Sequence, residues 1–174
     1  MSKLVPQRVL VLDRDGVINK KATKARYVTS WDEFEWVPGV KEALRILKDA
    51  EYTVIVATNQ AGIGRGVLTP NSLADIHDRM RKEVLEAGGE IAAIYICPHS
   101  PVEGCSCRKP KPGLLLKSQR DYGFNPECTY LIGDDQTDFD AAKAAGMPWL
   151  AVDESTSLAD HVMRLVSRGP ATAT

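Results

Sequence analysis

The chain has 174 residues and a formal net charge of −1, with 22 Lys and Arg residues against 23 Asp and Glu. This length suffices for one domain with a full hydrophobic core, and 44% hydrophobic and 26% charged residues are ordinary values for a globular protein. Balanced charge excludes a general nucleic-acid surface, and no apolar run approaches the roughly 20 residues that span a membrane. Because residues 1–7 also lack the apolar core of a secretory signal, we expect a cytoplasmic protein. We further expect a monomer without nucleic-acid or membrane partners.

Short apolar runs alternate with helical patterns along the chain, which predicts an α/β fold with a parallel sheet between helices. Residues 1–168 should form one domain, and residues 169–174 a disordered tail. In chain order we expect a strand at 8–13, a polar loop at 19–37, a helix at 38–50 that Pro38 opens, a strand at 53–57 and a helix at 70–87 that Thr69 caps. A strand at 91–96, a helix at 112–123, a strand at 129–132 and a helix at 138–145 should follow. The last two elements should be a strand at 149–152 and a helix at 158–166.

Carboxylates follow two of the predicted strands. Asp13 and Asp15 end the first strand, and the cluster Gly133-Asp134-Asp135-Gln136-Thr137-Asp138 ends the fourth. Open α/β sheets bind their ligands beyond the carboxyl ends of their strands, and a hard cation such as Mg²⁺ prefers oxygen ligands. The plainer alternative is that Asp and Gly only terminate strands. Two such strand ends, together with the basic motif described below, favour a magnesium site.

Three of the four cysteines lie close together, in the segment Cys97-Pro98-His99, five further residues, then Cys105-Ser106-Cys107. In an extended segment, residues i and i+2 point to the same side, so the segment offers two ligand pairs. A turn through Gly104 would bring the pairs together as a Cys₃His site, the closed coordination of structural zinc. The alternative is a redox or packing role. Cys128 stands apart, and we expect it to be a small buried residue.

Two further segments carry groups suited to phosphate. Thr58 and Asn59 end the second strand with a hydroxyl and an amide that can donate hydrogen bonds to phosphoryl oxygens. Arg108 and Lys109, in the run Arg108-Lys109-Pro110-Lys111-Pro112-Gly113, could neutralise phosphate charge. A short basic run is often only a solvated loop. Here it adjoins the Cys/His segment and precedes a helix, which favours a functional role.

Together these residues resemble a known family. The set Asp13-Arg14-Asp15-Gly16, Thr58-Asn59-Gln60, Lys109 and Gly133-Asp134 with Asp138 is similar to the four motifs of the haloacid dehalogenase (HAD) superfamily of phosphatases, in order and spacing over residues 8–152. The resemblance implies a Rossmann-like three-layer fold without a large cap domain. The loop 19–37 and the zinc loop 97–107 would then shape the pocket.

The zinc loop narrows the resemblance to the branch that holds histidinol-phosphate phosphatases and heptose-bisphosphate phosphatases. Three segments resemble the heptose enzymes more: residues 58–66 with their Arg65-Gly66 ending, residues 108–113, and Tyr27-Val28 followed by 34–39. One departure is Asp135, where many relatives carry Lys or Arg.

The resemblance also implies the site residues. Asp13 would be the nucleophile that forms an aspartyl-phosphate, and Asp15 would protonate the leaving oxygen and then deprotonate water. Mg²⁺ would be held by Asp13, Asp134 and the main-chain carbonyl of Asp15, and Zn²⁺ by the Cys/His segment. Thr58 and Lys109 would complete the catalytic set, and Asp138 would orient Lys109 or a metal-bound water. The candidate substrate-binding residues are Asn19, Asn59, Arg65, Arg108 and Asp135. Four further cations of the loop could attract a second phosphate, with a purely solubilising role as the alternative: Lys20, Lys21, Lys24 and Arg26.

The resemblance therefore implies an Mg-dependent phosphatase that acts on a small sugar bisphosphate, specifically at the 7-phosphate of heptose 1,7-bisphosphate. Histidinol phosphate is the alternative substrate. A pocket lined by arginines disfavours that substrate, because it carries a cationic amine. From another functional class, the alternative is a non-catalytic zinc module that binds a partner. Such a module would have no use for Asp13, Asp15 and Asp134 together.

Overall fold

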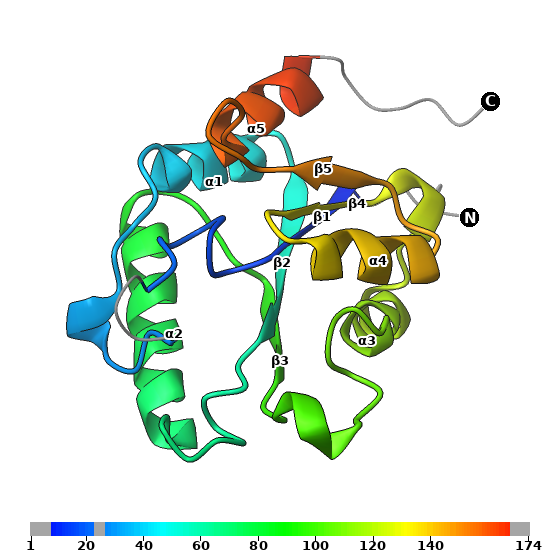
Figure 1. Cartoon of the computed structure of the whole chain (residues 1–174). Coiled ribbons are helices and arrows are strands. Elements are labelled where there is room, and N and C mark those ends of the chain that lie inside the picture. The colour runs from blue at the N-terminus through cyan, green and yellow to red at the C-terminus, as the bar shows by residue number, and fades with distance from the viewer. Residues whose placement is uncertain (1–7, 23–26, 168–174) are drawn as a thin grey trace.

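The computed structural model describes residues 8–22 and 27–167. Five parallel strands form one sheet in the order β3-β2-β1-β4-β5 (Figure 1). The strands are β1 Arg8–Leu12, β2 Tyr52–Asn59, β3 Ala93–Cys97, β4 Tyr130–Gly133 and β5 Trp149–Ala151. The helices are α1 Val40–Asp49, α2 Pro70–Glu86, α3 Gly113–Tyr122, α4 Gln136–Ala144 and α5 Leu158–Ser167, with 3-10 turns η1 Trp31–Glu33, η2 Pro101–Glu103 and η3 Pro126–Cys128. The predicted strands and helices are confirmed.

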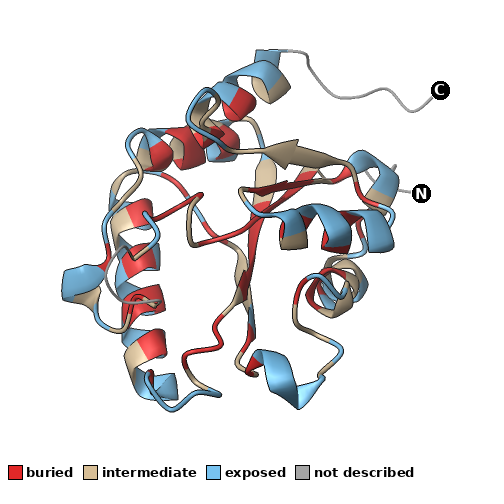
Figure 2. Ribbon diagram, viewed as in Figure 1, coloured by how far each residue is buried: buried red, intermediate tan, exposed pale blue. Residues whose placement is uncertain are grey.

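Helices cover both faces of the sheet, as Figure 1 shows. Along β1, Leu10 and Leu12 belong to a core with buried residues of α1, α2 and α5, whereas Val9 and Val11 face a second core with residues of α3 and α4. This alternation follows from the two-residue period of a strand. Burial is concentrated on the sheet and on the inner sides of the helices (Figure 2). The chain therefore has the three layers that the sequence predicted.

The strand order reverses next to β1, and this places the site. From β1 the chain continues through β2 to β3 on one side, then returns to β4 and β5 on the other. The reversal leaves a crevice at the carboxyl ends of β1 and β4, where open α/β sheets bind their ligands. Asp13 follows β1 and Asp134 follows β4, so the fold itself brings the two acidic segments together.

Some element ends differ from the prediction for local reasons. β2 extends past Ala57 because Thr58 and Asn59 still pair with β3, with Asn59 opposite Cys97. α1 begins at Val40 rather than Pro38, since Gly39 has a φ of 80°, which a helix cannot contain. Thr69 caps α2 as predicted and accepts a hydrogen bond from the Ser72 amide.

The loop after β1 packs against α2. The rings of Trp31 and Phe34 stack at 4.7 Å, Trp36 meets Phe34 edge-on, and the Trp36 indole donates to Glu83 of α2 at 2.8 Å. Lys24 and Arg26 of this loop, and the predicted tail at 169–174, lie outside the described residues. In the part of the chain that is described, no helix has the length and apolar character needed to cross a membrane.

The expectation that Cys128 is buried was wrong. It is exposed at the end of η3, where its sulfur lies 3.6 Å from Asn125 Nδ2 of the same turn. The burial begins one residue later, at Thr129, whose hydroxyl donates to the carbonyl of Asn125.

Candidate active site

Asp13 and Asp134 stand at the adjacent ends of β1 and β4. The Asp13 amide continues the sheet pairing by donating to the Ile132 carbonyl at 2.9 Å. Gly16, with a φ of 94°, turns the chain under Asp134, and a Cβ added there would lie 2.1 Å from Asp134 Oδ2. The glycine of the Asp-x-Asp-Gly motif is thus required twice, for the left-handed turn and for the close approach of a carboxylate.

Lys109 is the cation at the centre of the site. It is buried, and its Nζ lies 2.8 Å from Asp13 Oδ1, 2.6 Å from Asp138 Oδ1 and 2.8 Å from the Ala57 carbonyl. Asn59 fixes the main chain of Lys109 from both sides: its Nδ2 donates to the Lys109 carbonyl, and its Oδ1 accepts from the Lys109 amide, each at 3.0 Å. The arrangement agrees with the predicted role of Asp138 in orienting Lys109.

Burial and neighbouring charges set the protonation of these groups. Burial raises the pKa of Asp13 to about 6, against the opposing effect of Lys109. For Lys109, burial alone would lower the pKa, but the carboxylates of Asp13 and Asp138 raise it above its ordinary value, so the ammonium stays charged. Burial also raises the pKa of Asp134, only partly offset by the ammonium of Lys21 at 2.8 Å. A further cation beside Asp13 and Asp134 would therefore be favourable.

Asp15 is held by hydrogen-bond donors on both carboxylate oxygens. Oδ1 accepts from Arg14 Nη2 at 2.8 Å and from Asn19 Nδ2 at 2.9 Å, and Oδ2 accepts from Gln60 Nε2 at 2.9 Å. Burial alone would raise the pKa of Asp15, but the Arg14 guanidinium and these hydrogen bonds hold it below its ordinary value. Asn19 is fully buried, so the structure places it behind Asp15 as a support for that carboxylate.

A cavity of about 220 Å³ opens above these groups. Its lining combines the carboxylates Asp13, Asp15 and Asp135, the cations Lys21, Arg108 and Lys109, and the neutral polar Thr58, Asn59 and Thr137. Arg65 is not among the described residues that line it; the Arg65 guanidinium lies 5.9 Å from the centroid of the Tyr27 ring instead. The cavity therefore brings together the predicted catalytic residues and three of the five predicted substrate-binding residues, without Asn19 or Arg65.

The acidic end of the cavity fits a divalent cation. Asp13, Asp134 and Asp138 each offer a carboxylate oxygen, and these three atoms lie within 4.8 Å of one another. Asp134 Oδ1 is buried and accepts no hydrogen bond from the described residues. A buried carboxylate oxygen without a partner is costly, and a bound metal would satisfy it. Both oxygens of Asp138 already have partners, Lys109 Nζ and the Asp135 amide, whereas Asp13 and Asp134 are each engaged through one oxygen only, by Lys109 and Lys21. Asp13 and Asp134 are therefore the carboxylates able to hold the ion.

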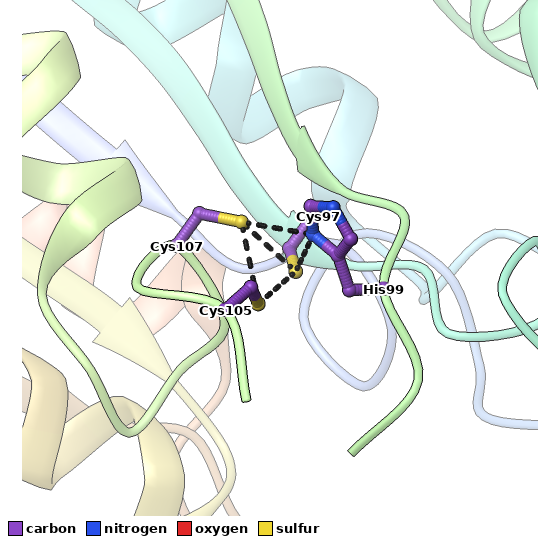
Figure 3. A group of neighbouring side chains, drawn as sticks. All are labelled: Cys97, His99, Cys105 and Cys107. Carbon is purple, nitrogen blue, oxygen red and sulfur yellow. Dashed lines mark hydrogen bonds between the residues drawn. The ribbon is translucent and has the colours of Figure 1, made fainter. Parts of the chain in front are cut away.

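The four residues of the Cys/His segment converge, as Figure 3 shows. His99 Nδ1 lies 3.6 Å from Cys97 Sγ and 3.3 Å from Cys107 Sγ, and the three sulfurs lie 3.2–3.6 Å apart. A tetrahedral zinc ion with Zn–S bonds of about 2.3 Å would place its sulfurs about 3.8 Å apart. All four cysteines of the chain are free. The cluster therefore has the ligand set and nearly the spacing of a closed zinc site.

Relatives of known function share most of the chain. It is 44% identical over 139 residues to the D-glycero-beta-D-manno-heptose-1,7-bisphosphate 7-phosphatase of Pseudomonas putida, covering 80% of this chain and 78% of that protein. The enzyme of the same name from Bordetella bronchiseptica is 40% identical over 144 residues, covering 82% and 79%. The chain belongs to the heptose-1,7-bisphosphate 7-phosphatase family of the HAD superfamily. A HAD-hydrolase-like family model also matches residues 106–173.

The structure of a family member agrees. The crystal structure of the B. bronchiseptica D,D-heptose 1,7-bisphosphate phosphatase, complexed with magnesium and phosphate, superposes with a TM-score of 0.86 at 35% identity, covering 93% of this chain and 99% of that one. A heptose-1,7-bisphosphate 7-phosphatase from Mycobacterium bovis, 36% identical over 78% of this chain and 72% of its own length, is named for the alpha anomer instead. The family therefore includes enzymes named for either anomer.

Three residues that contact Asp15 or line the cavity were given no role from the sequence. Gln60 and Arg14 both contact Asp15, and Thr137 lines the cavity. Asp135 was predicted to bind substrate and lines the cavity, and its Oδ1 also accepts from the Thr137 amide as the N-cap of α4. The spacing of Asp135 and Asp138 is that of a capping box, a signal present in the sequence, and it explains why α4 begins at Gln136.

Proposed function

We propose that this chain is an Mg-dependent phosphatase that removes the 7-phosphate of heptose 1,7-bisphosphate through an aspartyl-phosphate on Asp13. The proposal is supported by the named relatives and by the cavity, which sets a buried nucleophilic carboxylate beside three cations. Mg²⁺ held by Asp13, Asp134 and the main-chain carbonyl of Asp15 would screen the charge of the phosphoryl group. A non-catalytic zinc module would leave this buried set of charges without a purpose.

Four residues of the chain have separate roles in the proposed reaction. Asp13 attacks phosphorus while Asp15 gives its proton to the leaving oxygen, and Asp15 then takes a proton from the water that releases phosphate from Asp13. The three N–H groups of Lys109 are engaged by Asp13, Asp138 and the Ala57 carbonyl, so its positive charge offsets that of the phosphoryl group, and the Thr58 hydroxyl donates to a phosphoryl oxygen. Thr58 Oγ1 accepts from Gln60 Nε2 at 2.9 Å, which leaves the hydroxyl proton free for this contact. Charge stabilisation of this kind supplies most of the catalysis in phosphoryl transfer.

One observation carries the choice of a bisphosphate. Arg108 lines the cavity, and its Nη1 is buried without a hydrogen-bond acceptor among the described residues. A buried guanidinium nitrogen without an acceptor is costly unless a ligand supplies one. Arg108 adjoins Lys109, which faces the reacting phosphate, so it is placed to receive the second phosphate of the substrate. Histidinol phosphate would bring an ammonium toward Arg108 and Lys21 instead, and like charges disfavour it.

We also propose that the Cys/His cluster binds structural zinc. Cys97 ends β3 beside Asn59, and Cys107 directly precedes Arg108. A metal that ties these two segments together would fix the loop that carries Arg108 and Lys109. The ion would thus act on catalysis through position, with all four ligand places filled by protein.

The substrate choice is tested with Arg108→Ala, with Arg65→Ala as the matched control. We expect Arg108→Ala to lower kcat/KM for heptose 1,7-bisphosphate about ten- to a hundredfold, since a hydrogen bond to a charged group contributes about 1.5–3 kcal/mol. The same variant should hydrolyse heptose 7-phosphate nearly as well as the wild type, because that substrate leaves the second phosphate site empty. Arg65→Ala should change neither value.

Equal losses on both substrates would mean that Arg108 serves the chemistry or the fold, and the argument for a bisphosphate would fail. If histidinol phosphate were the better substrate of the wild-type protein, the alternative activity would replace the proposal.

A further inference from the structure

A buried arginine lies between the two acidic residues of the first motif and has no part in the mechanism above. Arg14 has a fully buried side chain, although it follows Asp13 and precedes Asp15. Burying a guanidinium is costly unless its charge is paired and its N–H groups find acceptors. Its Nη2 donates to Asp15 Oδ1 at 2.8 Å, and its Nη1 contacts His77 Nε2 at 3.1 Å. Arg14 therefore connects Asp15 to α2, which is far away in sequence.

The chemistry of this contact fixes the state of His77. An arginine can only donate, so Nε2 of His77 must accept, and the ring proton is on Nδ1. His77 is 8% exposed, and its burial, together with the Arg14 charge, lowers its pKa to about 3, which agrees with a neutral ring. His77 thus acts as a neutral hydrogen-bond acceptor. It fixes the orientation of the guanidinium but forms no ion pair with it, so Asp15 remains the charged partner of Arg14.

The two carboxylate oxygens of Asp15 accept different numbers of hydrogen bonds. Oδ1 accepts two N–H groups, from Arg14 and Asn19, and has no lone pair left for a proton. Oδ2 accepts a single N–H group, from Gln60, and keeps one lone pair. A proton on Asp15 must therefore sit on Oδ2, and Asp15 also lines the cavity.

We propose that His77 and Arg14 are positioning residues that hold Asp15 so that Oδ2 exchanges the proton of the reaction. The inference rests on the proposed function, in which Asp15 is the acid and base. In the first step the Oδ2 proton moves to the ester oxygen as its bond to phosphorus breaks and the Asp13–phosphorus bond forms. In the second step a water proton moves to Oδ2 as the water oxygen bonds to phosphorus and Asp13 leaves.

The test compares two leaving groups. An alkoxide leaves only with a proton, whereas 4-nitrophenolate leaves without one, so only an alkyl ester needs a well-placed acid. We expect His77→Leu to lower kcat/KM for heptose 1,7-bisphosphate about tenfold, part of the hundredfold or more that a general acid typically contributes. The value for 4-nitrophenyl phosphate should stay within about twofold of the wild type. His77→Gln, whose carbonyl oxygen can accept from Arg14, should restore the alkyl ester value.

Other outcomes overturn the inference. Equal losses on both esters, or a loss on the alkyl ester that Gln does not restore, would mean that His77 supports the fold alone. Unchanged values on both esters would mean that Asp15 needs no support from α2. A wild-type protein that hydrolyses simple alkyl phosphates but not the heptose bisphosphate would refute the proposed substrate only, and the same comparison would then be made with glycerol phosphate. A wild-type protein inactive on all of these esters would refute both proposals.

Discussion

Replacing Lys109 with Met should destabilise the protein more than any exposed charge substitution. The ammonium is 2% exposed and lies within 2.8 Å of Asp13, Asp138 and the Ala57 carbonyl. Methionine fills a similar volume but leaves two carboxylates without their cation. Removing one partner of a buried ion pair typically costs about 3–5 kcal/mol, because the remaining charge stays buried and uncompensated. We therefore expect the free energy of unfolding to fall by about 4 kcal/mol.

Urea unfolding in magnesium-free buffer measures this loss. A chelator should be left out, because it would also remove metal from the Cys/His cluster. Lys117→Met is the matched control: its ammonium lies 2.7 Å from Asp121 in an exposed pair, and such pairs contribute about 0–1 kcal/mol. Adding Asp138→Asn to Lys109→Met removes one of the stranded charges and should restore at least about 1 kcal/mol.

If Lys109→Met lowers the free energy of unfolding no more than Lys117→Met does, the buried ion pairs of Lys109 do not stabilise the protein as described. If the double variant is less stable than Lys109→Met alone, the buried charge of Asp138 is not the source of the loss.

Two further perturbations test the metal sites. Gly16→Ala would put a methyl group 2.1 Å from Asp134 Oδ2, so it should weaken Mg²⁺ binding about ten- to a hundredfold in calorimetric titration. Gly146→Ala is the control for backbone strain, because Gly146 has a φ of 70° but open space around it. This control should leave the Mg²⁺ affinity unchanged. Cys105→Ser with Cys107→Ser should reduce the zinc content from about one ion per chain to near zero and impair catalysis. An unaltered magnesium affinity in Gly16→Ala, or the absence of zinc from wild-type protein purified without chelators, would contradict the respective assignment.

The sequence predicted the elements well because each one carries a local signal. The apolar runs of β1 and β4 and the Thr69-Pro70 start of α2 are readable without tertiary information. The convergence of Asp13 and Asp134 was also predictable, because parallel strands end at one edge of a sheet. Ends that depend on strand partners, such as the extension of β2 to Asn59, were not.

The parts of the site that sequence reasoning missed arise from contacts between distant segments. His77 is 63 residues from Arg14, and no local pattern indicates that a helix residue will accept from a buried guanidinium. Asn59 was predicted to meet the substrate and lines the cavity, but nothing in the sequence indicates that its amide also fixes the main chain of Lys109, 50 residues away. Arg65 follows the Thr58 motif in sequence, but its side chain is exposed, and its guanidinium lies 5.9 Å from the centroid of the Tyr27 ring and outside the cavity lining.

The most direct test of the account is to trap the phosphoryl group on Asp13. The protein is mixed with heptose 1,7-bisphosphate and Mg²⁺, quenched in acid during turnover, digested and analysed by mass spectrometry. We predict that the peptide containing Asp13 gains the mass of one phosphoryl group, that the product retains its 1-phosphate, and that Asp13→Asn abolishes both the adduct and turnover. A phosphoryl group found on another residue, or undiminished Mg²⁺-dependent turnover by Asp13→Asn, would contradict the mechanism.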